Sequence, residues 1–441
     1  MQLLKTLLIF CSVAAAILIP SCSDSCSETT WPLKQSADKR YLVDQNDQPF
    51  FISAETAWKL MNALTTERMD DYLDNCVENG FNSVMFVFRP FQGTTDAYGN
   101  LPFEEDDITR PNEPFWANVD SLVVKARKRD MLLFGVMLWH KDDQNAEDGN
   151  RRNPLKYTVE QCRQLGHFLG SRYHPENGMD NLIFVGGGDK RPGPDAAKFE
   201  AMARAVLEEN PEALITYHSY HPRSSCDEWG YPDWLGLNAV YNYQPPHSPE
   251  WFWQEARNNW KDHASEMPIM LYEGLYEHAS RKGYHGTPAN IRKQHWWAVT
   301  SGCTAGHAVD HFRIWRMENL EEQLEDEART DMKHIRLLME SLEWWKREPD
   351  LDNQLLTGGL GRDERRATAC IADDGSYAII YSPNTEDPEV DLLKLNGPVE
   401  GKWYDPENGT YQELDLSLTS EALQIIPRPD TSDWVLILKT R

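Results

Sequence analysis

The chain has 441 residues, with 44 Lys and Arg against 70 Asp and Glu, so its formal net charge is −26. A surface this acidic repels phosphate backbones, which excludes nucleic acid as an expected partner. The length is too great for one compact sandwich and suits one large domain joined to a smaller one.

The N-terminal residues have the parts of a secretory signal. One lysine precedes an apolar run from Thr6 to Pro20, which is too short to span a bilayer and is followed by a small residue before Cys22. The segment Ile19–Cys22 resembles a lipobox, in which the cysteine thiol takes a lipid and becomes the new N-terminus. We expect a signal peptide over residues 1–21, a tether over 22–38, and an exported lipoprotein of the periplasm or outer membrane. Plain secretion is the alternative.

The cysteines beyond the tether contain no CxxC pair and lie far apart in the sequence. This spacing favours buried or free thiols over a zinc site or a disulfide framework. The residues are Cys76, Cys162, Cys226, Cys303 and Cys370.

Alternating strands and helices are predicted from Tyr41 to about Trp345. Short apolar runs, as expected of strands buried on both faces, alternate there with amphipathic helical patterns. The runs lie at residues 49–55, 82–89, 131–139, 181–189, 214–220, 234–241, 268–273 and 306–312. Eight such strands in about 300 residues predict a (β/α)8 TIM barrel over residues 39–350, which is an α/β fold. A doubly wound open sheet is the competing interpretation, but no glycine-rich phosphate turn follows the first strand.

The pattern changes after a helix that we expect to end at Glu343-Trp344-Trp345. Short strands follow it, and they predict a small antiparallel β-sandwich over residues 351–441. Turn pairs between these strands include Asp374-Gly375, Asn396-Gly397 and Asn408-Gly409. The two tryptophans are too apolar to leave in water. We expect them at or near the contact between barrel and sandwich, or within the packing of the barrel's own last helix.

Polar and aromatic side chains stand where the predicted strands end. In a barrel, the C-terminal ends of the strands meet at one mouth, where loops close over a substrate and catalytic groups gather. The residues at these ends are Glu55, Arg89, Trp139, His140, Asp189, His218, Asn242, Glu273, His307 and Asp310.

Asp189 and Glu273 are the candidate catalytic pair, because they end the fourth and seventh strands and would face each other across the mouth. Cleaving an acetal requires one carboxylic acid to protonate the leaving oxygen, and a second carboxylate to attack the anomeric carbon or activate water. Three glycines, Gly186 to Gly188, precede Asp189 and allow a bulge or a close backbone approach that aims its side chain. A carboxylate at the end of an apolar strand, like Glu273, is costly unless it is paired or exposed. The alternatives are a helix cap for Asp189 and an ion pair for Glu273.

Further side chains near the mouth are candidate substrate contacts. Sixteen tryptophans and seventeen tyrosines supply aromatic faces of the kind that stack on sugar rings, although most of them will be packing residues. Polar groups at the mouth would hydrogen-bond sugar hydroxyls or, for Tyr272, the nucleophile. The expected substrate-binding residues are Glu55, Trp58, Arg89, Trp139, His140, His218, Tyr272 and His307. Core or structural roles are the alternative.

Four histidines near strand ends, His218, His221, His307 and His311, raise the question of a metal centre. The set lacks an HxH pair on the first strand, and no HExxH motif occurs in the sequence. We therefore expect neither a metal nor another cofactor. A metal-dependent hydrolase remains one alternative to glycoside hydrolysis, and a catalytically silent barrel that binds glycans is another.

The start of the barrel segment resembles the apiosidase-like family of glycoside hydrolases. Residues 41–58 are similar to the family's G-x-P-F-x-x-x-G-D-T-A-W run, and Asn79–Asn82 to its K-G-F-N turn. The resemblance implies a retaining glycosidase with Asp189 as acid/base and Glu273 as nucleophile. It also implies an oligo- or polysaccharide substrate, of plant or host origin. The expected partners are this substrate and, through the lipid anchor, a membrane, with no obligate protein partner.

The C-terminal segment resembles the β-sandwich that accompanies this family, which is named for supposed collagen binding. Nothing in the sequence favours a collagen ligand. Within the barrel, Glu55 replaces the family's aspartate and Ser53-Ala54 replace its glycine-containing pair. Asp189 also differs from the Asn-Glu pair that is typical of the wider clan. These departures bear on the sugar specificity more than on the hydrolase chemistry.

Overall fold

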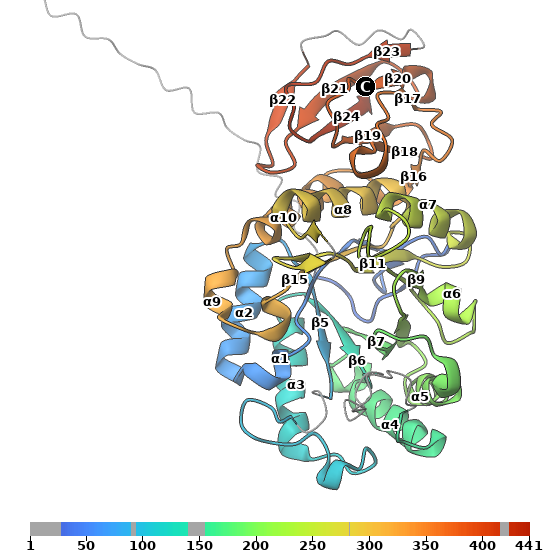
Figure 1. The fold of residues 1–441 in the computed structure, drawn as a ribbon. Coiled ribbons are helices and arrows are strands. Elements are labelled where there is room, and N and C mark those ends of the chain that lie inside the picture. The colour runs from blue at the N-terminus through green and yellow to red at the C-terminus, as the bar shows by residue number, and fades with distance from the viewer. Residues whose placement is uncertain (1–27, 90–93, 140–154, 282, 415–422) are drawn as a thin grey trace, which may run out of the picture.

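The computed structural model describes residues 28–89, 94–139, 155–281, 283–414 and 423–441. The predicted signal peptide, Cys22 and His140 lie outside the described residues. Within those ranges, no helix combines the length and the apolar character needed to cross a membrane. The described chain forms a barrel followed by a smaller β domain (Figure 1).

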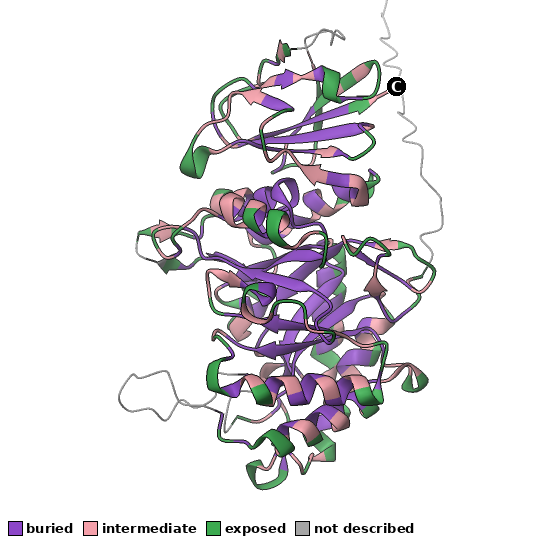
Figure 2. Cartoon of the chain, turned by 90° about the vertical axis from the view of Figure 1, so that its right-hand side faces the viewer, coloured by how far each residue is buried: buried purple, intermediate pink, exposed green. Residues whose placement is uncertain are grey.

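In the described part of the chain, eight parallel strands form the core of the barrel. They are β4 (Ile52–Thr56), β5 (Ser83–Val87), β6 (Leu132–Val136), β7 (Leu182–Gly187), β8 (Leu214–His218), β10 (Asn238–Tyr241), β11 (Ile269–Glu273) and β15 (Gly306–His311). They pair in the order β8-β7-β6-β5-β4-β15-β11-β10, and β8 lies against β10, so the ring is nearly closed. Apart from Leu214, every residue of these strands is buried (Figure 2). The predicted (β/α)8 barrel is confirmed.

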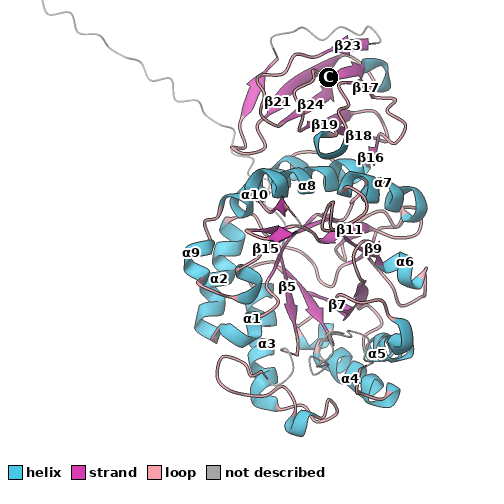
Figure 3. Cartoon of the chain, viewed as in Figure 1, coloured by secondary structure: helices cyan, strands magenta, loops and turns pink. Residues whose placement is uncertain are grey.

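Helices cover the outside of this ring (Figure 3). The longer ones are α2 (Thr66–Glu78), α3 (Glu113–Arg127), α4 (Val159–Arg172), α5 (Ala196–Glu209), α7 (Phe252–His263), α8 (Pro288–Ser301) and α10 (Glu327–Glu340). Short helices α1 (Leu60–Ala63), α6 (Ser225–Trp229) and α9 (Leu320–Gln323) accompany them. Side-chain caps begin several helices: Thr65 accepts a hydrogen bond from the backbone of Arg68, and Thr158 forms a capping box with Gln161.

Side chains of each barrel strand alternate between the barrel interior and the layer of helices. On β4, Ile52 and Ala54 belong to the apolar cluster inside the barrel, which also contains Met270 and Tyr272 of β11. The intervening residue of β11, Leu271, belongs to the larger cluster between strands and helices. This alternation decides which strand-end side chains can reach the mouth.

The C-terminal domain consists of two antiparallel sheets, ordered β16-β18-β19-β24-β21-β22 and β17-β20-β23. Their strands are β16 (Arg347–Pro349), β17 (Leu356–Gly358), β18 (Thr368–Ala372), β19 (Tyr377–Ser382), β20 (Glu389–Asp391), β21 (Val399–Tyr404), β22 (Tyr411–Glu413), β23 (Leu423–Ile425) and β24 (Trp434–Thr440). The turn glycines Gly375, Gly397 and Gly409 have φ values of 70°, 146° and 67°, a region that favours glycine. The predicted antiparallel β domain is confirmed.

One apolar cluster runs from the barrel helices into the sandwich. It contains Trp296 of α8 together with Tyr381 and Ile437 of the larger sheet. The rings of Trp296 and Tyr381 are stacked with centroids 5.9 Å apart. The two domains therefore share a continuous core along α8 and α10 (Figure 1).

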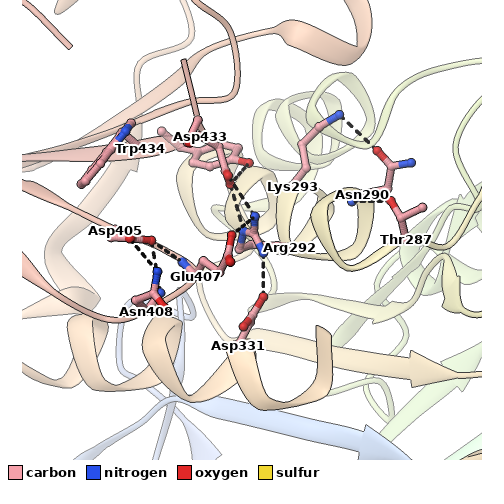
Figure 4. A network of polar contacts seen from close by, with 12 residues as sticks. Thr287, Asn290, Arg292, Lys293, Asp331, Asp405, Glu407, Asn408, Asp433 and Trp434 are labelled. Carbon is pink, nitrogen blue, oxygen red and sulfur yellow. Dashed lines mark hydrogen bonds and ion pairs between the residues drawn. The ribbon is translucent and has the colours of Figure 1, made fainter. Parts of the chain in front are cut away.

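A buried arginine of α8 links the two domains (Figure 4). Arg292 is 3% exposed and donates to Asp331 of α10 at 2.7 Å and to the two carboxylate oxygens of Asp433, each at 3.0 Å. A further bond reaches Glu407 at 3.2 Å. Burial opposes the charged form, but the hydrogen bonds and charges of Asp433 and Asp331 outweigh it and raise the pKa of Arg292. A cation desolvated to this extent depends on its partners.

The helix expected to end at Trp345 is shorter than predicted, because α10 ends at Glu340. Trp344 instead begins a short 3-10 turn and is buried, with its ring 5.3 Å from that of Phe51 in the barrel. The hydroxyl of Tyr377 in the sandwich donates to the carbonyl of Glu343 at 3.0 Å. Trp344 thus packs on the barrel beside the contact with the sandwich.

The cysteines beyond the tether are buried and form no disulfide within the described residues. Burial raises the pKa of each thiol, so none is poised to act as a thiolate. The expectation of buried or free thiols is confirmed for Cys76, Cys162, Cys226, Cys303 and Cys370.

Candidate active site

Asp189 is carried to the mouth by a glycine turn that follows β7. Gly187, Gly188 and Asp189 have positive φ values of 85°, 134° and 57°. A Cβ on Gly187 would lie 2.4 Å from the carbonyl oxygen of His218, so β7 and β8 approach too closely for a larger residue. The turn directs the Asp189 side chain to the mouth, where it is 17% exposed.

Glu273 reaches the mouth through an irregularity in β11. Regular alternation would place Tyr272 inside the barrel and Glu273 among the outer helices. The pairing with β10 shifts at this point, because Val240 pairs with Leu271 whereas the next residue, Tyr241, pairs with Glu273. The extra residue is a β-bulge, a device that re-aims side chains next to active sites. It brings Glu273 to the mouth while leaving it only 2% exposed.

Three polar side chains contact the Glu273 carboxylate, two of them through hydrogen bonds. Tyr243 and Tyr276, the latter in β12 (Tyr276–Glu277), donate their hydroxyl hydrogens to Oε1 at 2.9 and 2.7 Å. Nε2 of His218 lies 2.7 Å from Oε2. Burial, and then the charge of Glu273, raises the pKa of Tyr276 well above its usual value, so Tyr276 keeps its hydrogen.

Tyr241 joins the Asp189 carboxylate to the same network. Its hydroxyl hydrogen-bonds Oδ1 of Asp189 at 2.9 Å and also the hydroxyl of Tyr243. A continuous hydrogen-bonded chain therefore runs from Asp189 through Tyr241 and Tyr243 to Glu273. His218 stands between the two carboxylates, with Nε2 4.0 Å from Oδ1 of Asp189. One polar atom from each of Asp189, His218 and Glu273 lies within 4.8 Å of the other two.

A third carboxyl, that of Asp310 on β15, is buried beside this network. Its Oδ2 accepts a hydrogen bond from the backbone N–H of Gly274 at 2.6 Å, which holds the peptide that follows Glu273. Burial, and then the charge of Glu273, raises the pKa of Asp310 well above its ordinary value. Asp310 therefore helps to hold Glu273 in position through the backbone of the next residue.

Four of the predicted substrate contacts meet around the carboxylates. The ring of Trp58 stacks on that of His218, with centroids 5.8 Å apart, and Trp139 meets His218 edge-on at 5.3 Å. The ring of Tyr272 lies 5.0 Å from His218. Nε1 of Trp58 donates to the hydroxyl of Tyr276 at 3.2 Å. These rings form an apolar surround for the two carboxylates.

Arg89 lies beyond the end of β5, where the prediction placed it. It is 2% exposed, donates to Asp106 at 3.0 Å and lies over the ring of Tyr157, 5.7 Å from its centroid. These contacts tie together loops at the strand end. Its contact with a substrate stays a prediction, as does that of His140, which lies outside the described residues.

The predicted substrate contact of Glu55 is wrong. Ile52 and Ala54 point into the barrel, so Glu55 points outward into the layer of helices. There it is fully buried, accepting a hydrogen bond from Nε of Arg329 at 2.5 Å and one from the hydroxyl of Tyr72 at 2.7 Å. Glu55 is an internal ion-pair partner that holds α2 and α10 on the barrel.

The predicted substrate contact of His307 is also wrong. This residue stands second in β15, near the end of the strand that is opposite to the mouth. Its Nδ1 lies 3.0 Å from Nδ1 of His295 on α8, and its ring meets Phe51 edge-on at 5.9 Å. Burial lowers the pKa of His307 to about 3, so the imidazole is neutral and part of the core.

Sequence analysis missed three tyrosines of the site: Tyr241, Tyr243 and Tyr276. The first two stand two residues apart after an apolar strand, and a strand's period of two would have placed them on one side. No comparable pattern marks Tyr276, because its position depends on the path of the chain after Glu273.

Another cluster of histidines and a carboxylate lies outside the barrel, where Asp326 contacts His278 and His311. Nδ1 of His311 accepts two backbone hydrogen bonds, from Arg313 and Ile314, each at 3.1 Å. The hydrogen of the neutral imidazole is therefore on Nε2, which donates to Asp326 at 2.7 Å. A nitrogen that carries hydrogen offers no lone pair to a metal, so the cluster is arranged for hydrogen bonding.

Most of the chain matches a known family of enzymes. Residues 36–346 match the family described as "Apiosidase-like, catalytic domain", and residues 351–439 match the one described as "Putative collagen-binding domain of a collagenase". A search of curated proteins gives no match.

Two solved structures share the fold over nearly the whole chain. One, named a glycoside hydrolase, has a TM-score of 0.81 at 21% identity and covers 94% of this chain and 97% of its own. The other, a glycoside hydrolase family 5 protein from Bacteroides vulgatus, has a TM-score of 0.80 at 21% identity, with coverages of 92% and 93%. At this identity, the likeness shows the fold alone.

Proposed function

Because the chain belongs to the apiosidase-like family of glycoside hydrolases and is therefore a glycosidase, we propose that Asp189 is its acid/base and Glu273 its nucleophile. We further propose that cleavage proceeds with retention of anomeric configuration. The observation that carries the proposal is the meeting of these two carboxylates at the barrel mouth, within 4.8 Å of each other.

The separation of the two carboxylates supports retention. Retaining glycosidases hold their carboxyl groups about 5–5.5 Å apart, whereas inverting enzymes leave about 6.5–9.5 Å to admit a water molecule. One oxygen of Asp189 lies within 4.8 Å of one oxygen of Glu273, a spacing closer to the retaining range than to the inverting range. Direct attack by Glu273 fits this spacing.

The hydrogen-bonded chain between the carboxylates supports the division of roles. Its three contacts require three hydrogens, and Tyr241 and Tyr243 supply two of them. The third hydrogen must come from one of the carboxyl groups. Glu273 already accepts hydrogen bonds from Tyr243 and Tyr276, so we place the third hydrogen on Asp189, the proposed acid. A protonated acid beside an ionised nucleophile is the state needed before the first step.

The proposed reaction has two steps. In the first, Asp189 gives its proton to the glycosidic oxygen while Glu273 attacks the anomeric carbon, so the bond to the leaving group breaks and a glycosyl ester forms. In the second, Asp189 takes a proton from water, which attacks the same carbon and releases Glu273. Tyr243, Tyr276 and His218 hold the nucleophile in position throughout.

We propose a complex plant or host polysaccharide as the substrate, and an exported lipoprotein anchored through Cys22 as its location. The lipobox-like segment before Cys22 supports the anchor. Cys22→Ser should move the protein from the membrane fraction to the soluble fraction without changing its specific activity. Retention of that variant in the membrane would show that another segment provides the anchor.

A metal-dependent hydrolase is the second candidate, because Asp189, His218 and Glu273 present three possible ligand atoms to one point. Analysis of the purified protein for zinc and other divalent metals separates the two candidates. A stoichiometric metal whose removal abolishes turnover would favour the second candidate. Full activity after chelation favours the proposed carboxylate mechanism.

Asp189→Asn tests the assignment of the acid/base. The wild-type protein and the variant are first assayed on a panel of plant and host glycans. They are then compared on two glycosides of the same sugar, one with a natural leaving group and one with an activated leaving group. Loss of the acid should slow cleavage of the natural linkage by about 10²–10⁴-fold. A glycoside with an activated leaving group needs little protonation, so its first step should persist. Near-normal turnover of the natural linkage by folded Asp189→Asn would contradict the assignment. If the wild-type protein cleaves none of the glycans, a barrel that binds glycans without cleaving them is favoured.

A further inference from the structure

Tyr220 presents an exposed aromatic ring at the barrel mouth. It stands two residues beyond the end of β8, and 46% of its surface is exposed. Its ring stacks on that of His221, with centroids 4.6 Å apart and an interplanar angle of 27°. His221 also stacks on His247, at 4.5 Å and 26°. Tyr220 and His247 therefore both stack on His221.

The middle ring of this three-ring column, His221, contacts the catalytic network. The ring of His221 meets Tyr241 at 5.5 Å and 72°, and Tyr243 at 4.9 Å and 62°. Tyr241 and Tyr243 are the two residues that connect the catalytic carboxylates. His221 therefore connects the exposed ring of Tyr220 to the two tyrosines that contact Asp189 and Glu273.

A fixed exposed ring differs from an ordinary surface residue. Single exposed aromatics are common on proteins and need no special role. The ring of Tyr220, however, is already ordered by stacking, so a ligand that lands on it loses little side-chain entropy. The C–H face of a sugar ring is the apolar surface that matches an aromatic face.

We propose that Tyr220 is a platform for the sugar residue next to the scissile bond, so that the site takes a chain of sugars and not a single one. This proposal rests on the proposed glycosidase site of Asp189 and Glu273. His221 sets the height and tilt of the platform, and His247 stacks on His221 in turn. The ligand is an oligosaccharide whose neighbouring residue lays its C–H face on Tyr220.

The test compares Tyr220→Ala with Tyr231→Ala as a matched control. Tyr231 is 47% exposed and meets His263 edge-on at 5.8 Å, away from the carboxylates' hydrogen-bonded chain. The probes are oligosaccharides of two to six sugars from digests of pectin, hemicellulose and mucin. Affinity is measured calorimetrically in the Glu273→Gln background, and KM and kcat are measured in the active enzyme.

Tyr220→Ala should weaken binding and raise KM by about 3- to 10-fold, with a larger loss for longer chains and an unchanged melting temperature. Tyr220→Phe should restore both values, because it restores the ring. Equal affinities for Tyr220→Ala and Tyr231→Ala, in an enzyme that cleaves these probes, would overturn the platform alone. If the wild-type enzyme cleaves none and the Glu273→Gln variant binds none, the glycosidase site and the platform both fail.

Discussion

Two groups of buried carboxylates, one at the barrel mouth and one between the barrel and the sandwich, are held in different ways. At the mouth, Glu273 accepts hydrogen bonds from the neutral hydroxyls of Tyr243 and Tyr276. Between the domains, Asp331 and Asp433 accept from the cationic Arg292. Both arrangements place hydrogen-bond donors on carboxylate oxygens, but only in the second arrangement is the donor a cation.

This difference distinguishes the proposed nucleophile from the carboxylates that join the two domains. A guanidinium engages a carboxylate through strong paired bonds and leaves its lone pairs occupied. Tyrosine hydroxyls fix the orientation of Glu273 and leave the carboxylate free to attack a carbon. Glu55 follows the structural pattern, because Arg329 binds it inside the layer of helices. Glu273 therefore differs from Glu55 and from the partners of Arg292, because tyrosines and not an arginine bind it.

The largest expected effect comes from the same carboxyl-to-amide change made in each group. Glu273→Gln should remove the nucleophile and reduce kcat by at least about 10³-fold, with little change in melting temperature. Asp433→Asn should leave kcat near the parent value but lower the free energy of unfolding by roughly 1–3 kcal/mol, because Arg292 loses a charged partner. Activity assays and denaturant titrations of both variants are the measurements. Loss of activity by folded Asp433→Asn would contradict the distinction between the carboxylates at the mouth and those between the domains.

A smaller effect is expected from cutting the chain between the catalytic carboxylates. Tyr241→Phe removes the bond to Asp189, and Tyr243→Phe removes one of the bonds to Glu273. A hydrogen bond to a charged group contributes about 1.5–3 kcal/mol, so Tyr243→Phe should lose roughly 10- to 100-fold in kcat/KM. The partner of Tyr241 is the protonated acid, so Tyr241→Phe should lose roughly 2- to 10-fold. Pre-steady-state assays with an activated leaving group distinguish the two. Tyr243→Phe should slow formation of the glycosyl-enzyme even with the activated leaving group. Tyr241→Phe should mainly slow cleavage of natural linkages, which need the acid. Equal losses by the two variants on both kinds of substrate would argue against separate roles.

The third prediction changes stability alone and concerns Glu277, a buried carboxylate outside the mouth. It accepts a backbone hydrogen bond from Ala328 at 3.1 Å, and its Oε2 lies 4.0 Å from Nε2 of His311. Burial raises the pKa of Glu277 to about 8, whereas an unfolded glutamate titrates near about 4.3. The folded state thus binds the extra proton between these values, and stability should fall as pH rises through this window.

Glu277→Gln tests this linkage, because the amide cannot titrate. The parent should lose on the order of 1 kcal/mol per pH unit between about pH 5 and 8, and the variant should lose less. Melting temperatures of both proteins at several pH values are the measurement, with activity as the control. Identical pH dependence in parent and variant would show that Glu277 is ionised in the folded protein. A weaker pH dependence in the variant would sharpen the comparison, because a buried carboxylate away from the mouth would then affect stability and not activity.

Several features of the site could be predicted from the sequence because they follow from local rules. Apolar runs separated by helical patterns identified all eight strands, and the ends of those strands identified Asp189 and Glu273 as candidates. Trp58, Trp139 and His218 were predicted for the same reason, and they do meet around the carboxylates. Each inference needed only the position of a residue relative to its own strand.

The errors came from the direction in which a side chain points. Glu55 and His307 belong to barrel strands, yet alternation turns Glu55 away from the interior, and His307 stands near the wrong end of its strand. Glu273 would have been excluded by the same alternation, and only the β-bulge at Tyr272 returns it to the mouth. A bulge depends on pairing with the neighbouring strand, which no single segment of sequence contains.

The sequence by itself determined the order of the elements, the two-domain organisation and the chemical types of residue at the strand ends, because periodicity and turn chemistry are local. Tertiary structure alone decided which carboxylates meet cations and which meet tyrosines. It also decided that Tyr220, His221 and His247 stack into one column, although His247 is distant in the chain. These relations arise from closing eight strands into a ring, which brings separate strand ends to one mouth.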